Sequence, residues 1–147
     1  MAIIRIFDSV KRKKVDFIPI KSNIVKIYLC GPTVYDNAHL GHARSAITFD
    51  LLYRMLLKNN YEVIFVRNFT DIDDKIIKKS KETGIGIKEI TSTYIDSYLR
   101  DMNALNILKP SLEPCATENL DAMFDMIEIL LKDGKAYKTP NNDIYMR

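Results

Sequence analysis

The side chains with the most distinctive chemistry lie within thirteen positions, from Cys30 to His42. This stretch carries both histidines of the chain, His39 and His42, and one of its two cysteines. The histidines are three residues apart, so on a helix they project from similar sides of one turn. Imidazoles at a helix N-terminus could bind a phosphate there and stabilise charge that develops in a transition state. The alternative is a pair of surface histidines that only cap the helix.

Gly41 lies between the histidines, inside the predicted helix, where glycine costs ~1 kcal/mol relative to alanine. Such a glycine indicates that a flat or bulky group approaches the backbone closely. Cys30 is expected at the carboxyl end of a buried strand. It is either a small core hydrophobe or, if it points into a cleft, a nucleophile or a metal ligand. A Zn²⁺ site completed by His39 and His42 would take both histidines away from a phosphate.

A second polar cluster follows the next predicted strand of the chain. Asp71, Asp73 and Asp74 could form a Mg²⁺ or amine site. Asp73 and Asp74 are more simply interpreted as the N-cap and first turn of the following helix. Asn68 and Thr70 add neutral hydrogen-bonding groups to the same loop.

Two apolar runs and one helical pattern would position these residues. Residues 24–30 and 61–67 are predicted strands, and residues 40–58 a helix, because their apolar side chains recur at helical spacing. The nearly continuous apolar run at 24–30 is typical of a strand covered on both faces in a parallel sheet. Strand, helix and strand predict a right-handed βαβ unit, in which ligands bind beyond the carboxyl ends of the strands. Residues 31–38 and 68–75 should therefore face each other at one edge of the sheet.

The rest of the chain predicts helices at 73–83, 87–105 and 117–132, and two small hairpins. Residues 1–23 contain one hairpin, and residues 136–138 and 144–146 form the other. Pro110 and Pro114 indicate a connection. Two parallel strands are too few for a doubly wound sheet, so the predicted fold class is an incomplete α/β sheet. We expect the reading frame to continue beyond Arg147.

Composition and charge exclude several classes of protein. A length of 147 residues, 47% hydrophobic and 28% charged, is typical of one globular domain. The net charge of +3 is too small to argue for a nucleic-acid partner. No run approaches the ~18 apolar residues of a membrane span, and the N-terminus lacks a signal-peptide pattern. Two cysteines indicate reduced thiols in a cytoplasmic protein. The basic run at 11–14 is interpreted as a solvated turn.

Several blocks of the sequence resemble the catalytic domain of class I aminoacyl-tRNA synthetases, and within it the cysteinyl-tRNA synthetase family. His39-Leu40-Gly41-His42 is similar to the HIGH signature of that class, with Leu in place of Ile. The blocks at 28–36, 67–76, 101–108 and 116–118 are similar to the cysteine-specific family. The resemblance covers essentially the whole chain and implies a Rossmann-like parallel sheet of the HUP type with added helices and hairpins.

The resemblance also implies an activity: ATP-dependent activation of L-cysteine, through cysteinyl-adenylate, and transfer to the acceptor end of tRNA(Cys). His39 and His42 are the implied catalytic residues at the α-phosphate of ATP, which enters with Mg²⁺. Cys30 is the implied ligand of a Zn²⁺ ion that binds the substrate thiolate, since a soft metal distinguishes cysteine from serine better than an apolar pocket does. The implied ATP site comprises Pro32, Thr33, His39, Gly41 and His42, and the implied cysteine site comprises Cys30, Gly31, Thr33 and Thr70.

The same resemblance divides the chain at residue 135. Residues 1–135 would be the first half of the nucleotide-binding domain, and residues 136–147 the start of an inserted connective domain. The other zinc ligands, the KMSKS signature and the anticodon-binding part are expected beyond residue 147, so this chain alone is expected to be inactive. The protein is expected to be a monomer. Cys115 occupies a position where relatives usually carry arginine, so the role of that arginine is unfilled in this chain.

Two alternatives remain open. The first is a related ligase that joins cysteine to an amino sugar through the same adenylate, as in mycothiol synthesis. The second is a non-catalytic binding fragment that functions alone.

Overall fold

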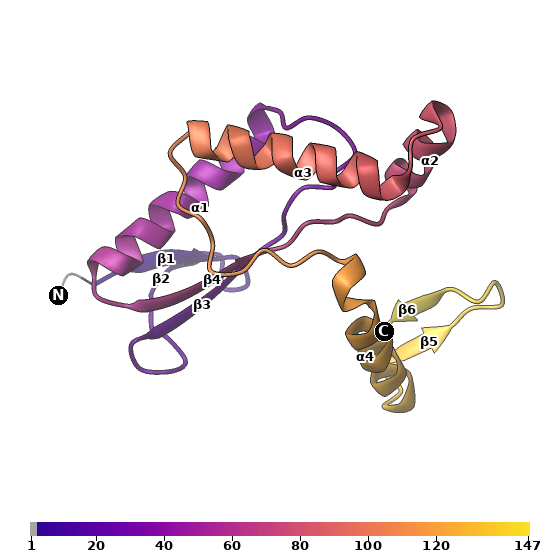
Figure 1. Ribbon diagram of the computed structural model, residues 1–147. Coiled ribbons are helices and arrows are strands. Elements are labelled where there is room, and N and C mark those ends of the chain that lie inside the picture. The colour runs from indigo at the N-terminus through magenta and orange to yellow at the C-terminus, as the bar shows by residue number, and fades with distance from the viewer. Residues whose placement is uncertain (1–2) are drawn as a thin grey trace.

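The computed structural model describes residues 3–147, so the first two residues of the predicted hairpin at 1–23 lie outside it. The chain forms small sheets and helices in a mixed α/β arrangement (Figure 1). In chain order the elements are β1 (Arg5–Asp8), β2 (Lys13–Asp16), β3 (Ile24–Leu29), α1 (Leu40–Lys58), β4 (Glu62–Arg67), α2 (Asp74–Thr83), α3 (Ile87–Ala104), the 3-10 helix η1 (Thr117–Asn119), α4 (Leu120–Lys132), β5 (Ala136–Lys138) and β6 (Ile144–Met146).

The predicted βαβ unit is confirmed. β3 and β4 pair in parallel, with Ile24 opposite Glu62 and Leu29 opposite Arg67. α1 connects them and has the predicted bounds. Because side chains alternate along a strand, one face of the pair turns towards α1 and builds a core cluster with it. The buried members of that cluster are Val25, Leu56, Val63 and Phe65.

The prediction that the first parallel strand is covered on both faces is wrong for the residues that the structure describes. Val25 is 5% exposed on the face of β3 towards α1, whereas Tyr28 on the other face is 65% exposed. The strand also ends one residue early, and Cys30 is exposed. The apolar residues of β3 therefore pack against α1 on one side of the strand, while no element within 3–147 covers the other side.

The connection predicted from the prolines forms a third strand-like run beside β4. The amide of Arg67 donates to the carbonyl of Leu112 at 3.1 Å, and the amide of Phe69 donates to the carbonyl of Pro114 at 2.9 Å. The bridges to residues 112 and 115 are parallel. Proline is tolerated in this position because an edge segment need not donate from every amide. Residues 111–116 therefore extend the sheet by one irregular strand.

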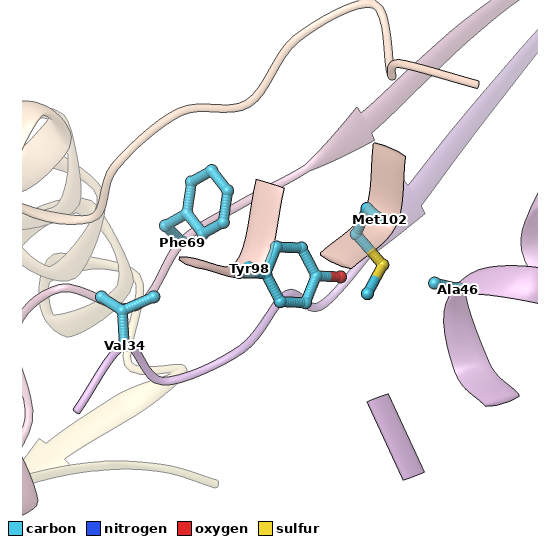
Figure 2. Close-up of a cluster of buried hydrophobic side chains, with 5 residues drawn as sticks. All are labelled: Val34, Ala46, Phe69, Tyr98 and Met102. Atoms are coloured by element: carbon cyan, nitrogen blue, oxygen red, sulfur yellow. The ribbon is translucent and has the colours of Figure 1, made fainter. Parts of the chain in front are cut away.

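A second core cluster lies beyond the carboxyl ends of β3 and β4. Figure 2 shows its five buried members, with the Tyr98 ring between Phe69 and Met102 and its hydroxyl on the side of Ala46. The cluster joins the loop after β3, the loop after β4, α1 and α3; its members are Val34, Ala46, Phe69, Tyr98 and Met102. α3 is thereby packed over the two loops that carry the candidate chemistry.

The C-terminal residues form a unit that stands apart from the βαβ body in Figure 1. α4 packs on β5, which pairs with β6, and none of the residues of α4 is buried. The predicted helix at 117–132 begins as η1 and becomes α-helical at Leu120. The Asp71 carboxylate accepts from the backbone amide of Thr117 at 2.9 Å and from its hydroxyl. Asp71 thus anchors the start of this unit to the βαβ body.

Candidate functional site

The loops after β3 and β4 face each other, as predicted, and are hydrogen-bonded together. The amide of Val34 donates to the carbonyl of Thr70 at 3.1 Å, and the amide of Thr70 donates to the carbonyl of Pro32 at 3.0 Å. The amide of Gly31 donates to Oδ1 of Asn68 at 2.8 Å. The parallel ladder therefore continues past the strand ends as far as the second core cluster.

Gly31 is required by this close approach of two backbones. A Cβ atom at position 31 would lie 1.6 Å from the carbonyl oxygen of Asn68, far inside van der Waals contact. No side chain could occupy this position without separation of the two loops. Gly31 therefore sets the distance between the loop that begins at Cys30 and the loop that contains Thr70.

His39 and His42 form a reciprocal cap at the start of α1. Nδ1 of His39 accepts from the amide of Gly41 at 3.1 Å, and Nδ1 of His42 accepts from the amide of His39 at 3.2 Å. The two rings also stack, with centroids 4.0 Å apart and planes at 28°. This is the geometry of a capping box, with imidazole nitrogens in place of the usual oxygens. Capping, which the sequence offered as an alternative to phosphate chemistry, is thus an observed role of both histidines.

The cap fixes the tautomer of both rings and leaves the N–H donor of each ring free of the cap. Because each Nδ1 accepts a hydrogen bond, the neutral ring carries its proton on Nε2. Burial lowers the pKa of His42, and the neighbouring His39 lowers it further. Both effects favour the neutral ring, in which Nε2–H remains a donor. Two such donors beside the free amides of a helix N-terminus suit an anion such as a phosphate.

The flat group that approaches Gly41 is the ring of His39 itself. A Cβ atom at position 41 would lie 2.8 Å from Cε1 of His39 and 3.0 Å from its Nδ1. The glycine inferred from the sequence to admit a flat group therefore makes room for the capping imidazole.

Cys30 and His42 line a common small cavity of about 50 Å³ at the carboxyl end of β3. Gly31, Pro32, Ser45 and two residues that the sequence interpretation left without a role, Arg67 and Tyr98, complete most of its wall. An arginine at the end of a mainly apolar strand was the signal for Arg67, because a buried guanidinium needs a specific partner. Tyr98 had no separate signal, since it lies on the apolar stripe of a helix.

Several predicted site residues are held by backbone contacts. Thr33 and Thr70 face each other as a parallel bridge, and Pro32 is buried beside them. The structure brings no group of three or more His, Cys, Asp or Glu side chains together for a metal within residues 3–147. Cys30 and the two histidines thus do not form the three-ligand zinc site that the sequence left open.

The acidic loop after β4 has structural roles. Asp73 is the N-cap of α2 and accepts from the amide of Lys75 at 2.8 Å, and Asp74 lies in the first turn. Gly84 ends the helix in the left-handed conformation, with φ 72°. Asp71 is buried and anchors Thr117. This arrangement supports the N-cap interpretation of Asp73 over a Mg²⁺ site.

Cys115 lies in the strand-like segment at 111–116. Burial raises the pKa of its thiol, and the carboxylates of Asp71 and Glu118 raise it further. The thiol is therefore predominantly protonated near neutral pH, and a protonated thiol is a poor nucleophile.

The mixed α/β fold of the chain, with its parallel strand pair, is consistent with a Rossmann-like fold of the HUP type. Its backbone is similar to that of the LeuRS–tRNA–LeuAMS ternary complex of Agrobacterium radiobacter K84, with a TM-score of 0.66 over 79% of this chain and 15% of that chain. The sequence identity of 21% makes this a likeness of fold alone.

The family model described as tRNA synthetases class I (C) catalytic domain matches residues 16–147, and the chain belongs to this family. It is 62% identical over 144 residues to a Cysteine--tRNA ligase of Wolinella succinogenes and 60% identical over 141 residues to one of Helicobacter pylori (strain HPAG1). These alignments cover 98% and 96% of this chain. The chain spans about 30% of the length of such relatives.

Proposed function

We propose that this chain provides the first part of the active site of a cysteine--tRNA ligase, which activates L-cysteine with ATP and transfers it to tRNA(Cys). The family membership supports the reaction class. The observation that carries the proposal is the reciprocal histidine cap, because it presents two Nε2–H donors at a helix N-terminus. The protein is proposed to act in the cytoplasm as a monomer. None of the helices between residues 3 and 147 is long and apolar enough to cross a membrane.

ATP would bind at the start of α1, with Pro32, Thr33, His39, Gly41 and His42 around it. The histidines would donate from Nε2 to the α-phosphate as the carboxylate of cysteine displaces pyrophosphate. Donors that are already oriented lose little free energy to reorganisation in the transition state. Mg²⁺ would accompany the other phosphates of ATP.

Cysteine would bind at the end of β3, beside Cys30, Gly31, Thr33 and Thr70. The exposed thiol of Cys30 fits the donor set of Zn²⁺, although it is a single ligand and the ion needs three or four. Cys30 would therefore hold Zn²⁺ together with ligands from outside residues 3–147. When bound, the ion would supply preference for a thiolate over a hydroxyl. Gly31 would keep this ligand at a fixed distance from Thr70.

The domain division remains part of the proposal. Residues 1–135 are assigned to the first half of the nucleotide-binding domain and residues 136–147 to the start of the inserted domain. α4 packs on β5, so the last helix of the first half would be the support on which the insertion begins.

A segment exchange tests the function. In the Wolinella succinogenes ligase, this chain replaces the 144 aligned residues, and cysteine-dependent exchange of pyrophosphate into ATP is measured. The unmodified chimera is expected to exchange, and His42→Ala is expected to lower kcat by about 10²-fold, because it removes one preorganised donor. Lys58→Ala, at the exposed far end of α1, is the matched control.

Unchanged exchange in the His42→Ala chimera would overturn the role of His42. A folded chimera that forms cysteinyl-adenylate but passes cysteine to an amino sugar and not to tRNA would instead favour the mycothiol-type alternative.

A further inference from the structure

Arg67 is a buried charge outside the two loops that carry the proposed chemistry. It is 2% exposed, and its Nη2 donates to Oε1 of Glu113 at 2.5 Å. Its Nε is buried without a hydrogen-bond partner among the described residues. Burial of an ion pair contributes little net stability, so such a pair is better explained by the geometry that it specifies.

Arg67 lies against the ring of Tyr98. The guanidinium carbon of Arg67 lies 4.9 Å from the centroid of the Tyr98 ring, which is a favourable cation–π distance. Phe69 meets the same ring edge to face, with centroids 5.8 Å apart and planes at 86°. Tyr98 is 5% exposed, so its ring is confined by the guanidinium, by Phe69 and by the surrounding core. Figure 2 shows its hydroxyl turned away from Phe69.

The confined ring of Tyr98 in turn meets His42. The two rings are edge to face, with centroids 6.5 Å apart and planes at 86°. His42 and Tyr98 also line the same cavity as Cys30. The cap hydrogen bond and the stacking of the His42 ring come from His39, at the start of the same helix. Tyr98 is therefore the partner of His42 that comes from a different helix, α3.

We propose that Tyr98, held by the Arg67–Glu113 pair, is a positioning residue that keeps the His42 ring in the orientation in which Nδ1 accepts the cap hydrogen bond and Nε2 carries the proton. Its importance for catalysis rests on the function proposed above. The positioning itself is a property of the 147-residue chain and can be measured without activity.

The chain offers a direct readout, because it contains just two histidines. Imidazole ¹⁵N NMR of the 147-residue chain distinguishes the Nε2–H tautomer from the Nδ1–H tautomer, and His39→Gln assigns the remaining signal to His42. Three variants are compared: Tyr98→Phe keeps the ring, Tyr98→Leu removes it, and Tyr94→Leu removes a ring one turn away on the same helix. Tyr94 packs against the same core cluster but pairs with Lys79.

The expected result is that the parent, Tyr98→Phe and Tyr94→Leu show the Nε2–H tautomer at His42, whereas Tyr98→Leu shows a mixture of tautomers. In the segment-exchange chimera, Tyr98→Leu should lower kcat for pyrophosphate exchange by about tenfold or more with little change in KM for ATP. Tyr98→Phe should restore the parent value. Where Tyr98→Leu does not fold, Tyr98→Met, whose flexible side chain also lacks a ring, takes its place.

The parent tautomer in folded Tyr98→Leu or Tyr98→Met would overturn the positioning role, whatever the activity. The same mixture of tautomers in Tyr94→Leu would overturn it too, since any loss of α3 packing would then suffice. A folded, inactive parent chimera would instead refute the proposed function, and the NMR comparison would still decide the positioning.

Discussion

The two ends of the stretch from Cys30 to His42 are held in different ways. At the helix end, each histidine is fixed by a hydrogen bond to Nδ1, by stacking and, for His42, by the Tyr98 ring. At the strand end, the Cys30 thiol is exposed, while its neighbour Gly31 is locked against Asn68. The chain therefore preorganises the groups proposed for phosphate chemistry. It places the proposed metal ligand but leaves its remaining partners to be supplied.

The largest effect on the difference between the two ends is expected from substitution of Gly31, at the strand end. In Gly31→Ala the new methyl group would meet the carbonyl of Asn68, so the two loops must separate. We expect the free energy of unfolding to fall by about 3 kcal/mol or more, because relief requires movement of backbone. Urea denaturation monitored by circular dichroism measures the change.

Gly86→Ala is the matched control for this variant. No atom lies within 4 Å of a Cβ placed at Gly86, and its φ of −63° suits any residue. A loss in Gly31→Ala no larger than in Gly86→Ala would show that the close approach of the loops is not a constraint.

A smaller effect is expected from protonation of His42. Its pKa in the folded chain is lowered by burial and by His39 from the ordinary value of 6.5, so the unfolded chain takes up the proton first as pH falls. The free energy of unfolding should therefore decrease as pH falls through 6.5 and level off below the folded pKa. Urea midpoints from about pH 7.5 to about pH 5.5 measure this, with His42→Gln as the control in which that component is absent. An equal pH dependence in both proteins would contradict the lowered pKa.

The smallest effect on stability is expected at Cys30. Because the thiol is exposed, Cys30→Ser should change the free energy of unfolding by less than about 0.5 kcal/mol. In the segment-exchange chimera the same substitution should abolish bound zinc, measured by metal analysis, and weaken cysteine binding. A full zinc complement would refute the ligand assignment, and a large loss of stability would show that the thiol has a packing role.

Local patterns predicted the elements well. The bounds of α1, the Gly84 stop of α2 and the hairpin β5–β6 all follow from periodicity and turn residues, which act over a few positions. The facing loops also followed from the sequence, because parallel strands end at the same edge of a sheet. The roles assigned to individual site residues from the family resemblance remain predictions.

Contacts between distant residues were not visible in the same way. Pro110 and Pro114 indicate only that the segment at 111–116 is a connection. Its pairing depends on the free edge of β4, which is distant in sequence. The apolar run of β3 gave no measure of how many faces are covered. The histidine cap was only one of two interpretations, since spacing alone does not orient a ring.

The irregular segment beside β4 also makes the two borders of the sheet unequal as pairing partners for another strand. Its prolines, Pro110 and Pro114, have no amide hydrogen to donate, so this border is a poor template for another strand. The opposite border, along β3, pairs with no further strand among residues 3–147. An additional strand would therefore pair more favourably beside β3, next to Cys30. Among residues 3–147, the border that is open to strand pairing is thus the one closest to the exposed thiol.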